Sequence, residues 1–378
     1  MSIGFLAVTW LSMGDWRLRG KNLLKSPFFW LFISVYVIHI LGISYSENQQ
    51  RAWKELEIKA SLLALPIMLF STKHLIGKHI QKLLISFIIG ALIMVMGSYF
   101  FALQGLFAGV KDSFFYYHLS APWGLNIVYY AMIVNAAFIF LAYLLHRNWK
   151  VVTIPIKLVG LLTIVIFVVF VFLSASILQV IALIVLVVIF SMKLALKQKK
   201  TWITILAPLL VIGLSFLLVS QFKVVDRFTI HYKRYKLKTN NKDGFHNRRL
   251  QLWQIAYDNI KVNPIIGVGT GDGQDVLNKT YAQKGLAAYT KKGNYNAHNQ
   301  FLQFGLTFGM VGFLLFLVSL LWPLIVALKA KDLVYVLFMV LMILSMLTEC
   351  ILQRQAGVVL FAFFNSLLAI KLLKVKKV

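Results

Sequence analysis

Long runs of apolar residues recur along the chain, separated by short polar segments. A helix needs about 20 mostly apolar residues to cross a hydrocarbon layer about 30 Å thick. Such runs predict membrane-spanning helices near residues 28–45, 55–71, 80–107, 125–145, 151–172, 174–193, 202–220, 299–328, 333–349 and 355–373. A weaker run at 3–14 is short for a full crossing. The pattern predicts an all-α polytopic membrane protein with about 10–12 transmembrane helices and one large, partly helical external loop.

The composition agrees with this fold class, because 60% of the 378 residues are hydrophobic and 13% are charged. Soluble domains average about 45–50% apolar and about 25% charged residues, so an ordinary soluble enzyme is excluded. We predict three parts, with transmembrane helices in 1–220, a large basic loop in 221–298 and further transmembrane helices in 299–378. Membrane lipids are therefore expected partners.

The chain contains 39 Lys and Arg against 12 Asp and Glu, a formal net charge of +27. In a soluble protein this excess would indicate nucleic acid binding, but here it gathers in alternate short loops. Basic residues favour cytoplasmic loops, so we expect no nucleic acid partner and a cytoplasmic C-terminus. The basic loops contain Arg17, Arg19, Lys21, Lys25, Lys73, Lys78, Lys82, Arg147, Lys150, Lys193, Lys197, Lys199, Lys200, Lys329, Lys331, Lys371, Lys374, Lys376 and Lys377.

One external segment breaks this pattern, since residues 221–297 contain 14 Lys and Arg against 5 Asp and Glu. Long loops cross the membrane largely regardless of charge, so an external position is compatible with the topology. Topology does not then explain the basic character, and a field of this sign attracts anions. The alternative is a solvated, charged loop that lies near lipid headgroups.

Within this loop, residues 247–257 have the pattern of a helix, with Asn247 as its N-cap and Pro264 just beyond its far end. One face of this helix is expected to pack against the bundle. The apolar positions at helical spacing on that face are Leu250, Trp253, Tyr257 and Ile260.

Arg248 and Arg249 lie in the first turn of the predicted helix, where the helix dipole gives cations no stabilisation. A phosphate-bearing ligand would explain this placement, because a guanidinium group is a planar fork of donors matched to phosphate oxygens. The alternative is a pair of interfacial arginines whose side chains extend to the membrane surface.

The segment from Gly267 to Gly273 reads Gly-Val-Gly-Thr-Gly-Asp-Gly. It lacks the spacing of the dinucleotide-binding fingerprint and the Gly-Lys-Ser/Thr of a P-loop. We predict a tight turn whose backbone approaches a ligand or another segment closely.

His298 lies at the mouth of the span that begins near Asn299. A neutral imidazole can accept a proton near neutral pH, whereas a helix cap or a simple contact with water is the alternative. Gly305, Gly309 and Gly312 follow on the same span and offer a small face for close helix packing.

Cys350, the single cysteine, lies in an apolar run, so neither a disulfide framework nor a cysteine-based metal site is expected. No cluster of carboxylates or histidines has the spacing of a metal site. We therefore expect no metal and no cofactor.

Two blocks of sequence have the character of a known family. The first places Arg249 and Trp253 four residues apart, ahead of Asn-Pro-Ile-Ile-Gly-Val-Gly-Thr-Gly-Asp at 263–272. The second is Ala-His-Asn-Gln-Phe-Leu-Gln at 297–303, followed by the glycines of that span. With the long external loop before the last spans, they resemble the O-antigen ligase/polymerase family, the Wzy_C-type lipid-linked glycan transferases. The stretch 349–357 also resembles the family's polar break between its last two spans.

The resemblance implies an inverting, metal-independent, GT-C-like glycosyltransferase of lipopolysaccharide biosynthesis. It would move a glycan from undecaprenyl diphosphate to an acceptor hydroxyl, that of lipid A-core for a ligase, at the periplasmic face of the bacterial inner membrane. Carried onto this chain, His298 would be the catalytic histidine and Arg249 the diphosphate-binding arginine, with Arg248 and Arg227 added on charge alone. The residues expected to support the site are Trp253, Gly267, Gly269, Asp272 and Asn299.

Two departures from the family pattern matter. Family members commonly have an arginine at the outer start of a middle span, but here residues 173–179 read Leu-Ser-Ala-Ser-Ile-Leu-Gln. If that arginine binds diphosphate, another cation such as Arg227 or Lys223 must substitute, or activity is reduced. The family also has both chain ends inside the cell, whereas the weak first span here would leave the N-terminus outside.

Several functions fit the same residues. A polysaccharide polymerase and a protein O-oligosaccharyltransferase differ from a ligase only in the acceptor, and the sequence gives a slight preference for the ligase. A transporter or flippase for lipid-linked anions would also explain a basic external face. It would need charged residues inside the spans, where Lys157 is the main candidate and Lys59 and Glu57 lie near a span end.

Overall fold

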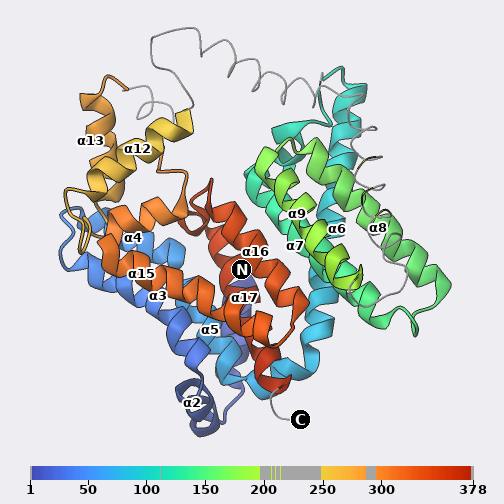
Figure 1. The fold of residues 1–378 in the computed structure, drawn as a ribbon. Helices are drawn as coiled ribbons and strands as arrows, with labels where there is room; N and C mark the ends of the chain where they lie inside the picture. The colour runs from blue at the N-terminus through green and yellow to red at the C-terminus, as the bar shows by residue number, and fades with distance from the viewer. Residues whose placement is uncertain are drawn as a thin grey trace. The chain divides into compact units, whose positions relative to one another are not determined.

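The computed structural model describes residues 2–110, 112–195, 248–286 and 295–375, together with positions 206, 209 and 213. This part of the chain is helical and contains no strand (Figure 1). Six of its helices are long and apolar enough to cross a membrane. They are α6 (Lys73–Phe107), α7 (Ile127–Asn148), α8 (Ile154–Leu173), α9 (Ile177–Ala195), α15 (Gln300–Lys329) and α17 (Gln355–Val375). The predicted class, an all-α polytopic membrane protein, is confirmed.

A further crossing is available if α2 (Trp16–Leu24) and α3 (Pro27–Ile43) form one span, bent by 83°. Pro27 explains the bend, because it has no backbone N–H to continue α2 but fits the first position of a new helix. Ser26, just before it, is accordingly extended. The weak run near the start of the chain forms α1 (Ser2–Ser12).

Two predicted spans are shorter in the structure than in the sequence pattern. The run at 55–71 divides into α4 (Gln49–Lys59) and the 11-residue α5 (Ser61–Ser71). The run at 333–349 contains α16 (Leu333–Met346), which has 14 residues. The predicted span at 202–220 lies outside the described residues apart from the three single positions given above.

By contacts between residues the chain divides into two units, and the first comprises Met1–Ile80, Arg248–Tyr335 and Met346–Val378. In this unit α17 packs on α5 and α3, and α15 packs on α3. The blue N-terminal helices therefore lie beside the orange and red C-terminal helices (Figure 1). Phe28 stacks on Trp322 with ring centroids 5.2 Å apart, which joins segments far apart in the sequence.

The second unit comprises Gln81–Asn247 and Val336–Ser345, and its helix α7 packs against α8 and α9. A buried polar network holds it together, because Asn135 Nδ2 donates to both the backbone and side-chain oxygens of Gln179 at 3.0 Å. Gln179 Nε2 in turn donates to Ser345 Oγ at 2.9 Å. Amides in an apolar environment are costly unless they are hydrogen-bonded, so this network favours one packing of these helices.

The predicted division of the chain into three parts, with boundaries at 220 and 298, concerns membrane topology and stays a prediction.

Candidate functional site

The helix predicted in the external loop is present as α12 (Arg248–Ile260), whereas its expected N-cap, Asn247, lies outside the described residues. The predicted packing face was partly wrong. Leu250 and Tyr257 are 52% and 50% exposed. The buried residues of α12 are Leu252, Ile255 and Ala256, with Ile260 partly buried beside them.

The reason for this difference is that α12 packs against two partners, α15 and α13 (Gly273–Gln283). The sequence contains two apolar stripes on α12, and the stripe that meets both neighbours is the one that becomes buried. The resulting cluster combines Leu252, Ile255, Ala256, Leu277, Tyr281, Ala297, Leu306 and Cys350. It fixes α12 and α13 onto the N-terminal half of α15.

The glycine-rich turn lies against a break in α15, where Gly309 has non-helical dihedral angles of φ 59° and ψ −156°. The break leaves helical donors and acceptors without partners inside the helix. The turn supplies them, because the N–H groups of Val268 and Gly269 donate to the carbonyls of Leu306 and Thr307 at 3.1 and 2.9 Å. In return, the N–H groups of residues 310 and 311 donate to the carbonyls of residues 264 and 265 at 2.8 and 3.2 Å.

Gly267 and Gly269, two of the predicted supporting residues, are required by this close approach. Both have positive φ values, 70° and 96°. A Cβ at Gly267 would meet the backbone of Thr307 and Phe308. Of the two expected uses of the turn, close approach to another segment is the one observed. On the N-terminal side of the break in α15, Gly305 lies against Ile260 of α12, which is the close packing predicted for a small residue.

Asp272 serves the start of α4, because its carboxylate accepts the N–H groups of Glu47 and Asn48, both at 2.8 Å. Thr270 adds a hydrogen bond from Oγ1 to the carbonyl of His39 at 2.6 Å. Donors at a helix start are favourable partners for an anion, so Asp272 ties the turn to α4. Both oxygens of the Asp272 carboxylate are thus engaged within the fold, and its role in the site stays a prediction.

His298 occupies a strained turn just before α15, with φ 44° in the left-handed region. Its N–H donates to Asn296 Oδ1 at 2.9 Å, and its carbonyl accepts Nε1–H of Trp253 at 3.3 Å. Asn299 caps α15 by accepting the N–H groups of Phe301 and Leu302 at 2.9 and 3.1 Å. Trp253 and Asn299 thus hold the segment that presents the imidazole.

A single carboxylate brings the two principal predicted residues together. Glu349 Oε2 lies 3.1 Å from Nδ1 of His298, and Glu349 Oε1 lies 3.3 Å from Nη2 of Arg249. The Glu349 side chain is 14% exposed, whereas those of His298 and Arg249 are 25% and 46% exposed. If Nδ1–H donates to this carboxylate, Nε2 has a free lone pair that can accept a proton.

Sequence reasoning noted Glu349 only as part of a polar break between the last spans. The feature that could have indicated it is its position, because it is an acidic residue at the end of an apolar run in a chain with only 12 acidic residues. Of the other predicted residues, Arg248 begins α12 and Arg227 lies outside the described residues. The segment 173–179, where an arginine was expected, belongs to the second unit.

Cys350 follows Glu349 and is fully buried. Burial raises the pKa of its thiol, so the group stays neutral near neutral pH and is unsuited to act as a nucleophile. Within the described ranges, no three His, Cys, Asp or Glu residues lie together as a metal site would require.

Comparison with known proteins addresses the reaction class. Residues 162–317, which form less than half of the chain, match the family described as O-antigen ligase. The predicted resemblance to the O-antigen ligase family is confirmed. The O-antigen ligase match includes Arg249, the glycine-rich turn and His298, and it ends before Glu349.

A relative in Haemophilus influenzae, itself an uncharacterized protein, is 30% identical over 139 residues. That alignment covers 35% of this chain and 33% of the relative. The chain therefore matches about a third of the length of this curated relative, and the comparison assigns no activity to the whole protein.

The close approach of the turn to α15 gives a testable consequence for stability. We expect Gly267→Ala to lower the free energy of unfolding by more than about 3 kcal/mol, because the added Cβ meets backbone atoms that cannot move aside. Gly285→Ala is the matched control, since Gly285 has the same φ of +70° but nothing within 4 Å. It should cost only the left-handed strain, about 1–2 kcal/mol.

Thermal unfolding of the purified full-length variants measures this difference. Equal losses of stability for the two variants would show that backbone strain alone, and not the contact with α15, limits position 267.

Proposed function

We propose that the protein is an O-antigen ligase-type glycosyltransferase, which moves a glycan from undecaprenyl diphosphate to an acceptor hydroxyl. The proposed place of reaction is the periplasmic face of the bacterial inner membrane. The observation that carries the proposal is the carboxylate of Glu349, which contacts both His298 and Arg249. A group suited to proton transfer and a group suited to binding diphosphate thus lie beside one another. The family match over residues 162–317 supports the reaction class.

In the proposed reaction, the acceptor oxygen attacks the anomeric carbon, and the bond from that carbon to the diphosphate oxygen breaks. Attack on the face opposite the leaving group inverts the anomeric configuration. The hydroxyl proton passes to Nε2 of His298, and the electron pair of the broken bond leaves with the diphosphate. Arg249 stabilises the negative charge that grows there. Fixed cations at a site of developing charge are usually the largest electrostatic contribution to catalysis.

Glu349 acts in this proposal as a positioning residue. Its carboxylate orients the imidazole and stabilises the imidazolium that forms when Nε2 takes the proton. Arg249 is far more exposed than Glu349, so the guanidinium can turn toward a diphosphate while the carboxylate stays against His298. Binding of the donor at Arg249 would then leave the contact between Glu349 and His298 in place.

The acceptor distinguishes a ligase from its nearest alternatives. We expect deletion of the gene to remove glycan from lipid A-core and to leave lipid-linked glycan behind, as measured by mass spectrometry of surface glycolipids. Loss of glycan from proteins, or shortened glycan chains still attached to lipid A-core, would instead indicate an oligosaccharyltransferase or a polymerase. A transporter would produce no new covalent product when the purified protein is incubated with donor and acceptor.

Replacement of His298 tests the proposed base. Asn is the preferred substitute because, unlike Ala, it readily adopts the left-handed conformation of this position. We expect His298→Asn to reduce the rate of glycan transfer by roughly 10²- to 10⁴-fold. His74→Asn, at an exposed position in α6, is the matched control and should leave the rate unchanged. Full transfer by His298→Asn would remove the histidine from the mechanism.

Glu349→Gln separates positioning from simple packing, because it keeps the size of the side chain and removes its charge. We expect kcat to fall by about 10²-fold or more, with a much smaller change in KM for the donor. Glu57→Gln, at an exposed position of α4, is the control. Steady-state transfer assays on the purified protein measure both constants. Wild-type kcat in Glu349→Gln would refute the positioning role.

A further inference from the structure

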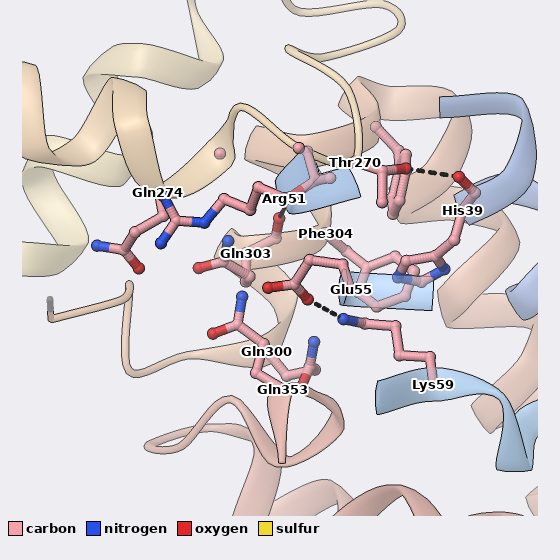
Figure 2. Close-up of a pocket in the computed structure, with 14 residues that line it drawn as sticks. His39, Arg51, Glu55, Lys59, Thr270, Gln274, Gln300, Gln303, Phe304 and Gln353 are labelled. Carbon is pink, nitrogen blue, oxygen red and sulfur yellow. Dashed lines mark hydrogen bonds and ion pairs between the residues drawn. The ribbon is translucent and has the colours of Figure 1, made fainter. Parts of the chain in front are cut away.

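A polar cleft lies within the first unit, next to the segment that carries His298. It has about 400 Å³ of empty space when its opening to solvent is included. Its walls come from α3, α4, the glycine-rich turn, α13, the N-terminal part of α15 and the short helix η3 (Ile351–Gln353) (Figure 2). Two hydrogen bonds link it to the 295–300 segment. Gln274 Nε2 donates to the carbonyl of Tyr295 at 3.0 Å, and Asn296 Nδ2 donates to Gln353 Oε1 at 2.5 Å.

Three glutamines of the cleft, Gln300, Gln303 and Gln353, use only the oxygen of the amide for the protein. Their Oε1 atoms accept from Leu352 N at 2.7 Å, Ala297 N at 3.3 Å and Asn296 Nδ2 respectively. Their Nε2 groups have no acceptor among the residues that the structure describes.

Gln300 and Gln303 are only 1% and 5% exposed. These amide donors have little contact with bulk water, and a ligand in the cleft that supplies hydrogen-bond acceptors would pair with them.

The charges that line the cleft are already compensated. Arg51 is paired with Asp275, and Lys59 is paired with Glu55, as Figure 2 shows for the second pair. The Lys59 side chain is only 4% exposed, so its partner is needed to offset the cost of burying the ammonium group. Because neither cation is in excess, the cleft favours a neutral polar ligand over a phosphate.

Aromatic side chains complete the wall. Phe304 and Phe308 line the cleft, and both are fixed by other rings. Phe304 stacks on Phe316 at 4.1 Å, and Phe308 meets His39 edge-on at 4.7 Å. Rigid apolar surface beside a few convergent polar groups is the usual composition of a small-molecule site. For a sugar, C–H faces would meet the rings and hydroxyl groups would accept from the amides.

We infer that this cleft binds one sugar unit of the glycan through its hydroxyl groups, beside the reacting centre. The assignment of that sugar as a substrate rests on the proposed function. The sugar can belong to the donor or to the acceptor, since both present the same chemistry.

The test measures binding of methyl glycosides to the full-length protein in lipid nanodiscs by saturation-transfer NMR. The glycosides are those of a neutral hexose and a neutral N-acetylhexosamine, with inorganic phosphate as competitor. At least one glycoside should bind, and phosphate should not displace it. Failure of every glycoside to bind, or displacement by phosphate, would overturn the assignment.

Gln353→Met removes one amide donor and should weaken glycoside binding by about 10-fold. Gln355→Met, two residues along at an exposed position, should bind as the wild type does. Asn296→Ala removes the same Asn296–Gln353 hydrogen bond from its other end and leaves the Gln353 amide without a competing acceptor at position 296. It should retain binding. Equal weakening in Gln353→Met and Asn296→Ala would show that only the lost internal bond matters, which would refute the role of the amide.

Transfer assays on Gln353→Met then identify the source of the sugar, because KM should rise for whichever substrate places its sugar in the cleft. The two proposals can fail separately. Glycoside binding without any transfer by the wild type would refute the proposed transferase activity but not the sugar site. Transfer without glycoside binding would refute the sugar site alone.

Discussion

The exchange of backbone hydrogen bonds at the break in α15 is the constraint on which the site depends. Residues 264–269 take the place of one turn of the helix, donating to two of its carbonyls and accepting from two of its N–H groups. Backbone groups that stay unpaired in an apolar environment have a large cost in free energy. Residues 264–269 are therefore fixed to α15, and α12 and the turn before α15 are positioned with them.

The shared carboxylate of Glu349 gives that framework its chemistry. The negative charge of Glu349 offsets the repulsion between the Arg249 guanidinium and an imidazolium at His298, so the two groups can lie close together. The pairing also makes each partner sensitive to the other. A ligand that draws Arg249 away leaves the carboxylate to the imidazole alone, which couples the two halves of the proposed reaction through electrostatics rather than through movement of the backbone.

The basic composition of residues 221–297 and the charge balance of the cleft have different physical meanings. An excess of Lys and Arg over Asp and Glu favours the attraction of anions in general. Inside the cleft, each cation has its own carboxylate, and the groups left over are amides. In the proposed function, the attraction of the charged carrier and the recognition of the uncharged glycan would therefore depend on different residues.

The sequence by itself determined the helical class, most of the spans, a helix close to 247–257 and the candidate pair Arg249 and His298, because these follow from the length of apolar runs and from local residue chemistry. Only the tertiary structure decided which stripe of α12 is buried, that the glycine-rich turn repairs a broken helix, and that Glu349 stands between the pair. Those outcomes depend on contacts between residues that lie 100 or more positions apart in the sequence. Periodicity does not encode such contacts, since burial and hydrogen bonding are settled only when the distant partner is in place.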